Sequence, residues 1–263
     1  MSSIERICLS PNGQLLYVLC AKLKNRYEYE SEEEDHGYDP PNDYYIDVLN
    51  VSDGSLDIRF HLESWYHLSG VSASNELFMV NDFGHVKVLD VTDGSIRFFE
   101  NRSTSVGYSR RRLCIVGESL YVADNGEKCI YVFNADGTYI QRIGVEGWVD
   151  PERDVHVMLV SPGGEIFLTN KRDIHVHHLT DGTYIRSIVP GAHSEITLSP
   201  DGEFLFVDDP RSGKIKMLRA ANGTLVQEIG VNSRDEVSSM CVSPDGGELF
   251  VAYQTGRIKV FKL

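Results

Sequence analysis

Short apolar runs alternate with turn residues along the chain. The clearest copy is Glu195–Gly230, where four apolar runs are separated by Pro200-Asp201-Gly202, by the polar break Asp208–Gly213 and by Asn222-Gly223-Thr224. Short runs rich in strong β-formers, bounded by Gly, Pro, Asn and Asp, predict β-strands. This stretch contains no helix-like segment, so we expect an all-β unit of four strands.

A turn made of Asp or Asn, then Gly, then Ser or Thr recurs five times. Its glycines are 40, 43, 45 and 41 residues apart. Such dipeptides between apolar runs are strong hairpin signals, because glycine adopts positive φ without penalty. The five turns are Asp53-Gly54-Ser55, Asp93-Gly94-Ser95, Asp136-Gly137-Thr138, Asp181-Gly182-Thr183 and Asn222-Gly223-Thr224.

A second marker, Ser-Pro-x-Gly or a remnant of it, precedes each of these turns and occurs once more near the end. Pro suits the first corner of such a turn and Gly the last. Six copies predict six structural units. The copies are Ser10-Pro11-Asn12-Gly13, Ser72-Ala73-Ser74-Asn75, Gly117-Glu118, Ser161-Pro162-Gly163-Gly164, Ser199-Pro200-Asp201-Gly202 and Ser243-Pro244-Asp245-Gly246.

Four antiparallel strands every 40 to 45 residues are typical of β-propeller blades. One such unit has two apolar faces and cannot bury them alone, whereas six units stacked around an axis bury both. A β-sandwich is the competing architecture, but six copies at one period disfavour it. We predict a six-bladed β-propeller of four-stranded antiparallel blades that spans residues 1–263 as a single domain.

The last unit ends after its third predicted strand, Arg257–Lys262. Only six residues precede the first predicted strand at Ile7, too few to supply an outer strand from the other terminus. We therefore expect a three-stranded final blade that closes the ring by side-chain packing against the first. Its exposed edge would carry Lys259 and Lys262, and charged residues commonly block edge pairing.

The third unit carries a family resemblance. It contains Leu120-Tyr121-Val122-Ala123-Asp124, then Lys128-Cys129-Ile130-Tyr131-Val132-Phe133, then an Asp-Gly turn and a strand that ends at Gly144. These motifs resemble the NHL repeat, whose families form six-bladed propellers, and the resemblance extends over nearly the whole chain. Units one and four lack the basic residue before Ile or have it displaced. The Trp-Asp repeat fits less well, since neither Trp65 nor Trp148 precedes Asp.

Residues 26–43 depart from the repeat between the second and third strands of unit one. They hold eight acidic residues and one arginine, and so contribute −7 of the net charge of −14. A long insertion at this point is either functional or a solvated spacer. Our functional hypothesis is a non-enzymatic interaction module that binds a protein or peptide, in particular a basic one, on the face that bears this acidic loop. The proposed partner-binding residues are Tyr27, Tyr29, Glu32, Glu33, Glu34, Asp35 and Tyr38.

An enzyme is the alternative. The chain is similar to gluconolactonase-like hydrolases and amidating lyases, propellers that hold a metal in the central channel. This similarity implies Ca²⁺, which prefers oxygen ligands, or Zn²⁺, at candidates near the ends of second strands: Asp82, Asp124, Asn170 and Asp208. An Asp there can instead cap the following turn through its own backbone. Our leading hypothesis includes no cofactor.

Two further groups of residues could carry chemistry. His175 and His177 share one face of a predicted strand, and with His156 they could bind Zn²⁺. A histidine-rich exposed strand is the simpler interpretation. The basic run Arg110-Arg111-Arg112 is interpreted as a solvated turn with salt bridges, because three arginines are a weak basis for nucleic-acid binding.

The bulk composition narrows the partners and the compartment. A net charge of −14 over 263 residues disfavours binding to the phosphate backbones of nucleic acids and to anionic membrane surfaces. The N-terminus lacks the apolar core of a signal peptide, and no run has the roughly 18 apolar residues of a membrane helix. The five cysteines lack CxxC spacing and lie mostly among apolar neighbours, which indicates a reducing compartment. We expect a cytoplasmic or nuclear monomer.

Overall fold

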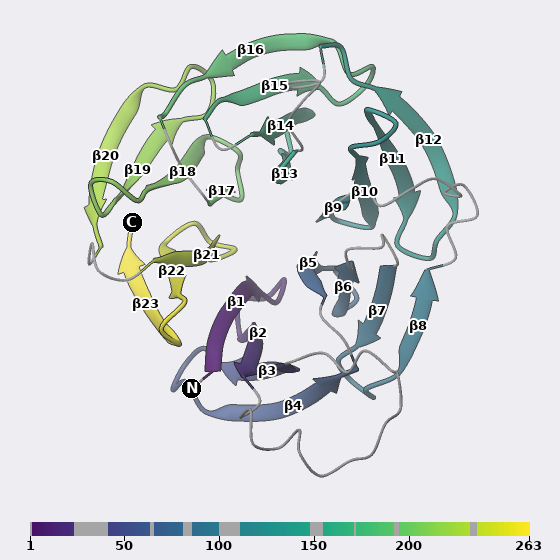
Figure 1. Cartoon of the computed structure of the whole chain (residues 1–263), viewed down its shortest axis with the longest axis vertical. Helices are drawn as coiled ribbons and strands as arrows, with labels where there is room; N and C mark the ends of the chain where they lie inside the picture. Colours follow the sequence, from purple (N-terminus) through teal and green to yellow (C-terminus); the bar gives the residue numbers. More distant parts are fainter. Residues whose placement is uncertain are drawn as a thin grey trace, which may run out of the picture.

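Six β-sheets are arranged around a central axis (Figure 1). The computed structural model describes residues 2–23, 42–63, 66–80, 86–99, 111–147, 155–170, 172–191, 195–231 and 236–263. Each sheet is one blade, and the described part of the chain contains strands and turns but no helix. The prediction of an all-β, six-bladed propeller is therefore confirmed, and so is the three-stranded last blade.

The blades follow the chain in order. Blade one contains β1 (Ser2–Leu9), β2 (Leu15–Leu23), β3 (Asn42–Asn50) and β4 (Leu56–Leu62). Blade two contains β5 (His67–Val71), β6 (Glu76–Val80), β7 (Val86–Asp90) and β8 (Ile96–Phe99). Blade three contains β9 (Arg111–Val116), β10 (Ser119–Asp124), β11 (Cys129–Asn134) and β12 (Tyr139–Gly144). Blade four contains β13 (Val157–Val160), β14 (Glu165–Thr169), β15 (Ile174–His178) and β16 (Tyr184–Ile188). Blade five contains β17 (Ile196–Leu198), β18 (Phe204–Asp209), β19 (Lys214–Arg219) and β20 (Leu225–Gly230). Blade six contains β21 (Val237–Val242), β22 (Glu248–Tyr253) and β23 (Arg257–Lys262).

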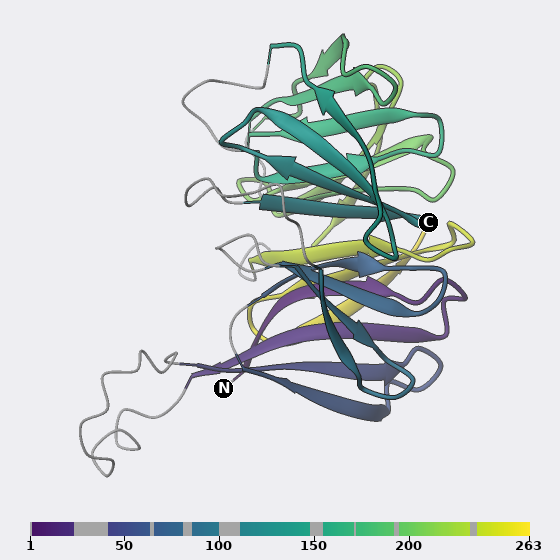
Figure 2. The same cartoon turned by 90° about the vertical axis from the view of Figure 1, so that its right-hand side faces the viewer.

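Within each blade the strands pair antiparallel in sequence order, with the first strand innermost and the last outermost (Figures 1 and 2). Each turn between a first and a second strand therefore lies on one face of the ring. Each connection between a second and a third strand lies on the opposite face, where the first strands begin. We call this second face the mouth face.

Both turn markers have a hydrogen-bonding role. The carboxylate or amide oxygen of each Asp-Gly or Asn-Gly turn accepts the backbone N–H two residues later, as Asp181 does from Thr183 at 2.9 Å. Such a turn is favoured because the side chain mimics a backbone acceptor. Each serine of the Ser-Pro-x-Gly marker is buried and accepts the N–H at the start of the second strand, as Ser199 Oγ does from Phe204. The remaining examples are Asp53, Asp93, Asp136 and Asn222, and Ser10, Ser72, Ser161 and Ser243.

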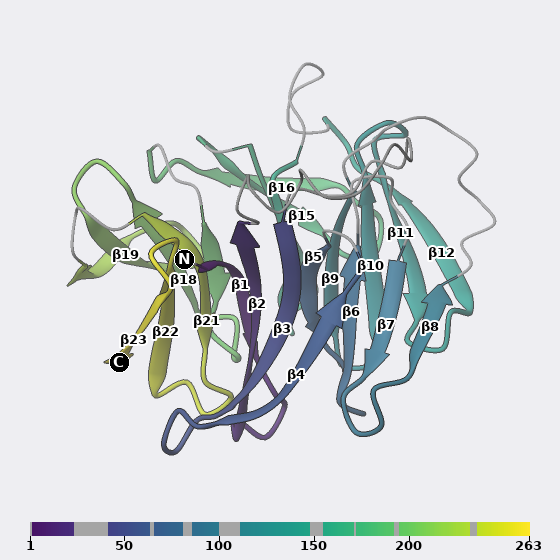
Figure 3. The same cartoon turned by 60° about the horizontal axis from the view of Figure 1, so that its bottom comes forward.

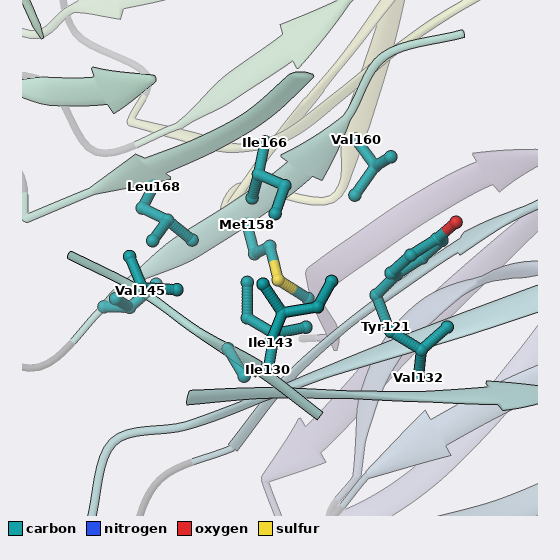
Figure 4. Packing of buried hydrophobic residues seen from close by; sticks show 11 residues of the cluster. Tyr121, Ile130, Val132, Ile143, Val145, Met158, Val160, Ile166 and Leu168 are labelled. Carbon is teal, nitrogen blue, oxygen red and sulfur yellow. The ribbon is translucent and has the colours of Figure 1, made fainter. Parts of the chain in front are cut away.

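The hydrophobic core lies between neighbouring blades. Figure 4 shows the cluster between blades three and four, where Ile130 and Ile143 of blade three meet Met158 and Leu168 of blade four. All four are at most 3% exposed. Burying an aliphatic side chain contributes about 1.5–3 kcal/mol, so the ring holds together through these interfaces.

Turn glycines let the blades approach closely. Gly182 of blade four has φ +75°, and a Cβ there would lie 2.0 Å from the backbone oxygen of Gly144 in blade three. The Gly182 carbonyl also accepts the N–H of Glu146 at 3.1 Å. Glycine is thus required at this position for both its conformation and its proximity to the preceding blade.

The ring closes between blades six and one (Figure 3). Ile4 and Ile7 of β1 share a buried cluster with Phe250 and Ala252 of β22, so the predicted closure by side-chain packing is present. The first strand begins at Ser2 rather than at Ile7 as predicted, because β1 pairs with β2 as far as Lys22.

Candidate functional site

A central channel follows the axis of the ring. The innermost strands of all six blades line a cavity of about 190 Å³. Its walls are mostly aliphatic, for example Leu68, Leu113, Met158 and Met240. The polar lining is concentrated where the first strands begin, near the mouth face.

A polar ring encircles this part of the channel and consists of Arg6, His67, Arg112, Glu195 and Ser239. These residues hold corresponding positions near the start of five first strands. Each is paired with the corresponding position of its second strand: Arg6 with Leu19, His67 with Val80, Arg112 with Ala123 and Ser239 with Ala252, while the Glu195 carbonyl accepts the N–H of Asp208. The repeat thus places one polar side chain from each of five blades at one level of the channel.

The ring contains an ion pair between non-adjacent blades. Arg6 Nη1 of blade one donates to Glu195 Oε2 of blade five at 2.6 Å, and the Glu195 side chain is only 12% exposed. Burial raises the pKa of Glu195 to about 7, and Arg6 opposes this shift. Perturbed carboxyls in a cleft are candidates for function. Glu195 is the most strongly shifted carboxylic acid in the described chain.

Arg112 contacts two other residues that line the channel, His67 and His156. Its Nε donates to the backbone oxygen of His156 at 2.5 Å, and its Nη1 lies 3.5 Å from His67 Nε2. Arg112 belongs to β9 and its side chain faces the channel. Our interpretation of Arg112 as part of a solvated turn was therefore wrong, because the strand begins at Arg111 and turns the Arg112 side chain inward.

A second hollow, of about 210 Å³, opens at the mouth face and shares Arg6 and His67 with the channel. Three carboxylates line it, Glu5, Glu195 and Glu236, against one guanidinium, that of Arg6. Because Glu195 already pairs with Arg6, the hollow has an excess of negative charge. We call it the acidic mouth.

The opposite end of the channel has a different chemistry. The hollow there is lined by the turns between first and second strands, including Pro11, Pro200, Pro244 and Ala73. It contains no charged side chain among its described lining residues. The two ends of the channel therefore offer different surfaces to a partner, one acidic and one apolar.

The three described metal candidates make hydrogen bonds to backbone N–H groups. Asp124 Oδ1 accepts the N–H of Gly126 and of Glu127, and Asn170 Oδ1 accepts those of Arg172 and Asp173. Asp208 Oδ1 accepts the N–H of Glu195. The fourth candidate, Asp82, lies outside the described residues. Within the described ranges, no three His, Cys, Asp or Glu side chains form a group that could hold a metal ion.

The histidines do not form one cluster. His175 and His177 share a face of β15 as predicted, with their rings 6.5 Å apart, and burial lowers the pKa of both. His177 is fully buried, and its Nδ1 lies 3.2 Å from the Gly182 oxygen. His178 is exposed, whereas His156 lines the channel.

The acidic insertion connects to the mouth face. It lies between the end of β2 at Leu23 and the start of β3 at Asn42. Of the predicted 26–43 segment, Asn42 and Asp43 belong to β3. The proposed binding residues lie outside the described residues: Tyr27, Tyr29, Glu32, Glu33, Glu34, Asp35 and Tyr38.

The polar ring was not predicted from the sequence, because the candidate site residues were placed at the ends of the second strands. A signal was present in the sequence, since Arg6, His67, Arg112 and Glu195 each precede a Ser-Pro-x-Gly marker or its remnant by four or five residues. Recognising them required the inference that first strands, rather than second strands, line the axis of a propeller.

Comparisons with known proteins support the fold and nothing finer. No family model matches the chain, and no curated protein matches it. The hydrazine synthase of Kuenenia stuttgartiensis is similar in structure, with a TM-score of 0.62 and 12% identity over 99% of this chain and 96% of that one. Matches extend to 1393 chains of solved structures, and a similarity shared so widely identifies an architecture rather than a function. The NHL resemblance thus stays a sequence-based interpretation.

No helix suited to crossing a membrane is found in the described residues.

Proposed function

We propose that this propeller is a non-enzymatic interaction module of the NHL-like type, which binds a basic protein or peptide on its mouth face. One observation carries the proposal. The acidic mouth, lined by Glu5, Glu195 and Glu236, opens on the same face from which the acidic segment departs. Two sources of negative charge on one face attract a cationic partner and speed its encounter.

The chemistry of the mouth suits a lysine or arginine side chain. Tyr66 offers an apolar ring for an aliphatic stem, and Gln254 is a further polar group of the lining. Long basic side chains bury their stems against apolar surface while their charged heads meet carboxylates. The acidic segment would add contacts around this anchor, through its tyrosines and its carboxylates.

Charge reversal tests the proposal with a matched control. The Glu5→Lys, Glu236→Lys variant reverses two charges at the mouth, whereas Glu118→Lys, Glu203→Lys makes the same change at exposed turns on the opposite face. Binding of a fluorescent oligo-arginine peptide is measured by anisotropy. We expect the mouth variant to bind about tenfold more weakly and the control to bind almost as well as the parent. Equal weakening of both variants would mean that the peptide responds only to net charge.

A second variant tests the acidic segment. Residues 24–41 are replaced by a short Asn-Gly turn, which leaves β2 and β3 intact. We expect an unchanged melting temperature and weaker, less salt-dependent peptide binding. Undiminished binding would remove the segment from the proposed site.

A further inference from the structure

We propose that the outer edge of β23 binds an extended segment of a partner protein, which adds a fourth strand to blade six. Blades one to five each have four strands, but in the described part of the chain no fourth strand joins the sheet of blade six beyond β23. An open edge presents backbone N–H and C=O groups that a partner strand can use. Figure 1 shows β4, β8, β12, β16 and β20 on the outside of the ring, with β23 outermost in blade six.

The complete blades show what the added strand would cover. In blades three, four and five, an isoleucine of the third strand lies opposite an isoleucine of the fourth, and the third-strand member is 0% exposed. Ile258 holds the corresponding position in β23, opposite Ala252 as Ile130 is opposite Ala123, yet it is only half-buried. The occupant therefore needs an aliphatic residue opposite Ile258. The three pairs are Ile130 with Ile143, Ile174 with Ile188 and Ile215 with Ile229.

The neighbouring blade leaves room for that strand. Turn glycines contact the outer strand of the preceding blade, as a Cβ at Gly223 would lie 2.8 Å from Ile188 and one at Gly182 would lie 2.0 Å from Gly144. Gly54 has the same place in blade one and a similar φ of +71°, but no described atom lies within 4 Å of its Cβ position. The space beside Gly54 is where an outer strand of blade six would run.

Blade five indicates the charge of the occupant. Lys216 of β19 lies opposite Glu228 of β20, and Lys214 forms an ion pair with the same carboxylate. In β23, Arg257 and Lys259 hold these two positions. Lysines at these positions are thus compatible with a fully paired strand and do not by themselves block it. An acidic residue opposite Lys259 would lie within reach of Arg257, and Arg257 would stabilise it as Lys214 stabilises Glu228.

The same charges argue against a second copy as the occupant. Pairing two β23 edges would bring Arg257, Lys259 and Lys262 of both copies together, and like charges on facing strands are destabilising. The structure therefore favours an extended segment in which an acidic residue directly precedes an aliphatic one.

A peptide with the sequence of residues 223–230, Gly-Thr-Leu-Val-Gln-Glu-Ile-Gly, is the probe. We expect it to bind, seen by anisotropy, and to slow amide hydrogen exchange in β23. Replacing its isoleucine by asparagine should weaken binding more than about tenfold. Replacing its glutamate by lysine should weaken binding about two- to fivefold, and the Arg257→Glu variant of the protein should restore it.

A tethered strand keeps the test decisive if the free peptide binds too weakly to measure. A copy of residues 221–230 is appended after Leu263, which matches the connection between β19 and β20. Tethering raises the effective concentration of the strand, so the melting temperature should rise by several degrees, and the isoleucine-to-asparagine version should not raise it. The proposal would be overturned if both extended proteins melted at the same temperature and amide hydrogen exchange in β23 were not slowed. If amide exchange in β23 slowed with rising protein concentration in the absence of any added strand, self-association would explain the result and the proposal would also be overturned.

Discussion

Arg6 and Glu195 are 189 residues apart in sequence, and their side chains form an ion pair 2.6 Å long. They belong to blades one and five, the two neighbours of blade six, which is the blade with three strands. The pair therefore bridges the two blades on either side of blade six. It links the first blade to the fifth on the channel side of the ring. A buried pair of this kind costs desolvation energy, so removing one partner is more harmful than replacing both.

The first prediction concerns the loss of the cation. Arg6→Met leaves the buried Glu195 without its partner, so we expect the free energy of unfolding to fall by about 2–3 kcal/mol at pH 8.5. The loss should be smaller at pH 5.5, where Glu195 binds a proton. The double variant Arg6→Met, Glu195→Leu should recover most of the stability. Urea titrations at both pH values measure this, and a loss independent of pH would contradict it.

The second prediction is the pH dependence of stability. Glu195 has a pKa of about 7 in the folded protein, raised from 4.5 by burial. Between these values the folded state binds more protons than the unfolded state, so this group's contribution to stability is full below pH 4.5 and is lost as pH rises through 7. Relative to Glu195→Gln, the parent should lose on the order of 3 kcal/mol over this range. A constant difference between the two unfolding free energies would exclude the shift.

A third prediction compares two turn glycines with similar backbone conformations. Gly182→Ala and Gly54→Ala both place a Cβ at positive φ, which costs about 1–2 kcal/mol. Only at Gly182 does the Cβ also meet a neighbouring blade, at 2.0 Å from a backbone oxygen. We expect the unfolding free energy to fall by at least about 2 kcal/mol more for Gly182→Ala. Equal effects would show that conformation alone selects glycine there.

The fourth prediction concerns the thiols. Burial raises the pKa of all five cysteines, to about 12 for Cys8 and about 11 for Cys20 and Cys114. Because the thiolate is the reactive form, we expect a thiol reagent at pH 7.5 to modify the folded protein slowly. All five should react promptly in denaturant. Fast labelling of the folded state would contradict the raised pKa values of these thiols.

The fifth prediction addresses the metal-enzyme alternative. A ligand that binds only the folded state raises its melting temperature. Because Asp124 and Asn170 cap their own turns, we expect unchanged melting with Ca²⁺, Zn²⁺ or a chelator. Asp124→Ala should instead lower stability by about 1 kcal/mol with or without metal. A calcium-dependent rise that disappears in Asp124→Ala would revive the enzyme hypothesis.

The repeat made the fold predictable. Turn glycines such as Gly182 and turn serines such as Ser199 recur because local backbone geometry demands them, so each blade has a signature in the sequence. The three-stranded final blade was also predicted, since the last unit shows three strand patterns, and the structure has these three strands. The NHL assignment was not confirmed, because no family model matches the chain.

The channel was not predictable in the same way. Arg6 and Glu195 look like ordinary polar residues before a strand, and only closure of the ring brings them into contact. The length of β1 was underestimated because Ser2 to Glu5 has no continuous apolar run. Its extension depends on pairing with β2 and on packing against blade six.

Locating a bound basic peptide on the surface tests the proposed function most directly. Hydrogen exchange measured by mass spectrometry, with and without oligo-arginine, reports the location. We predict slower exchange around Glu5, Glu195 and Glu236 on the mouth face, with no change at the Ser-Pro-x-Gly turns of the opposite face. Protection confined to those turns, such as Ser199–Gly202, would contradict the account.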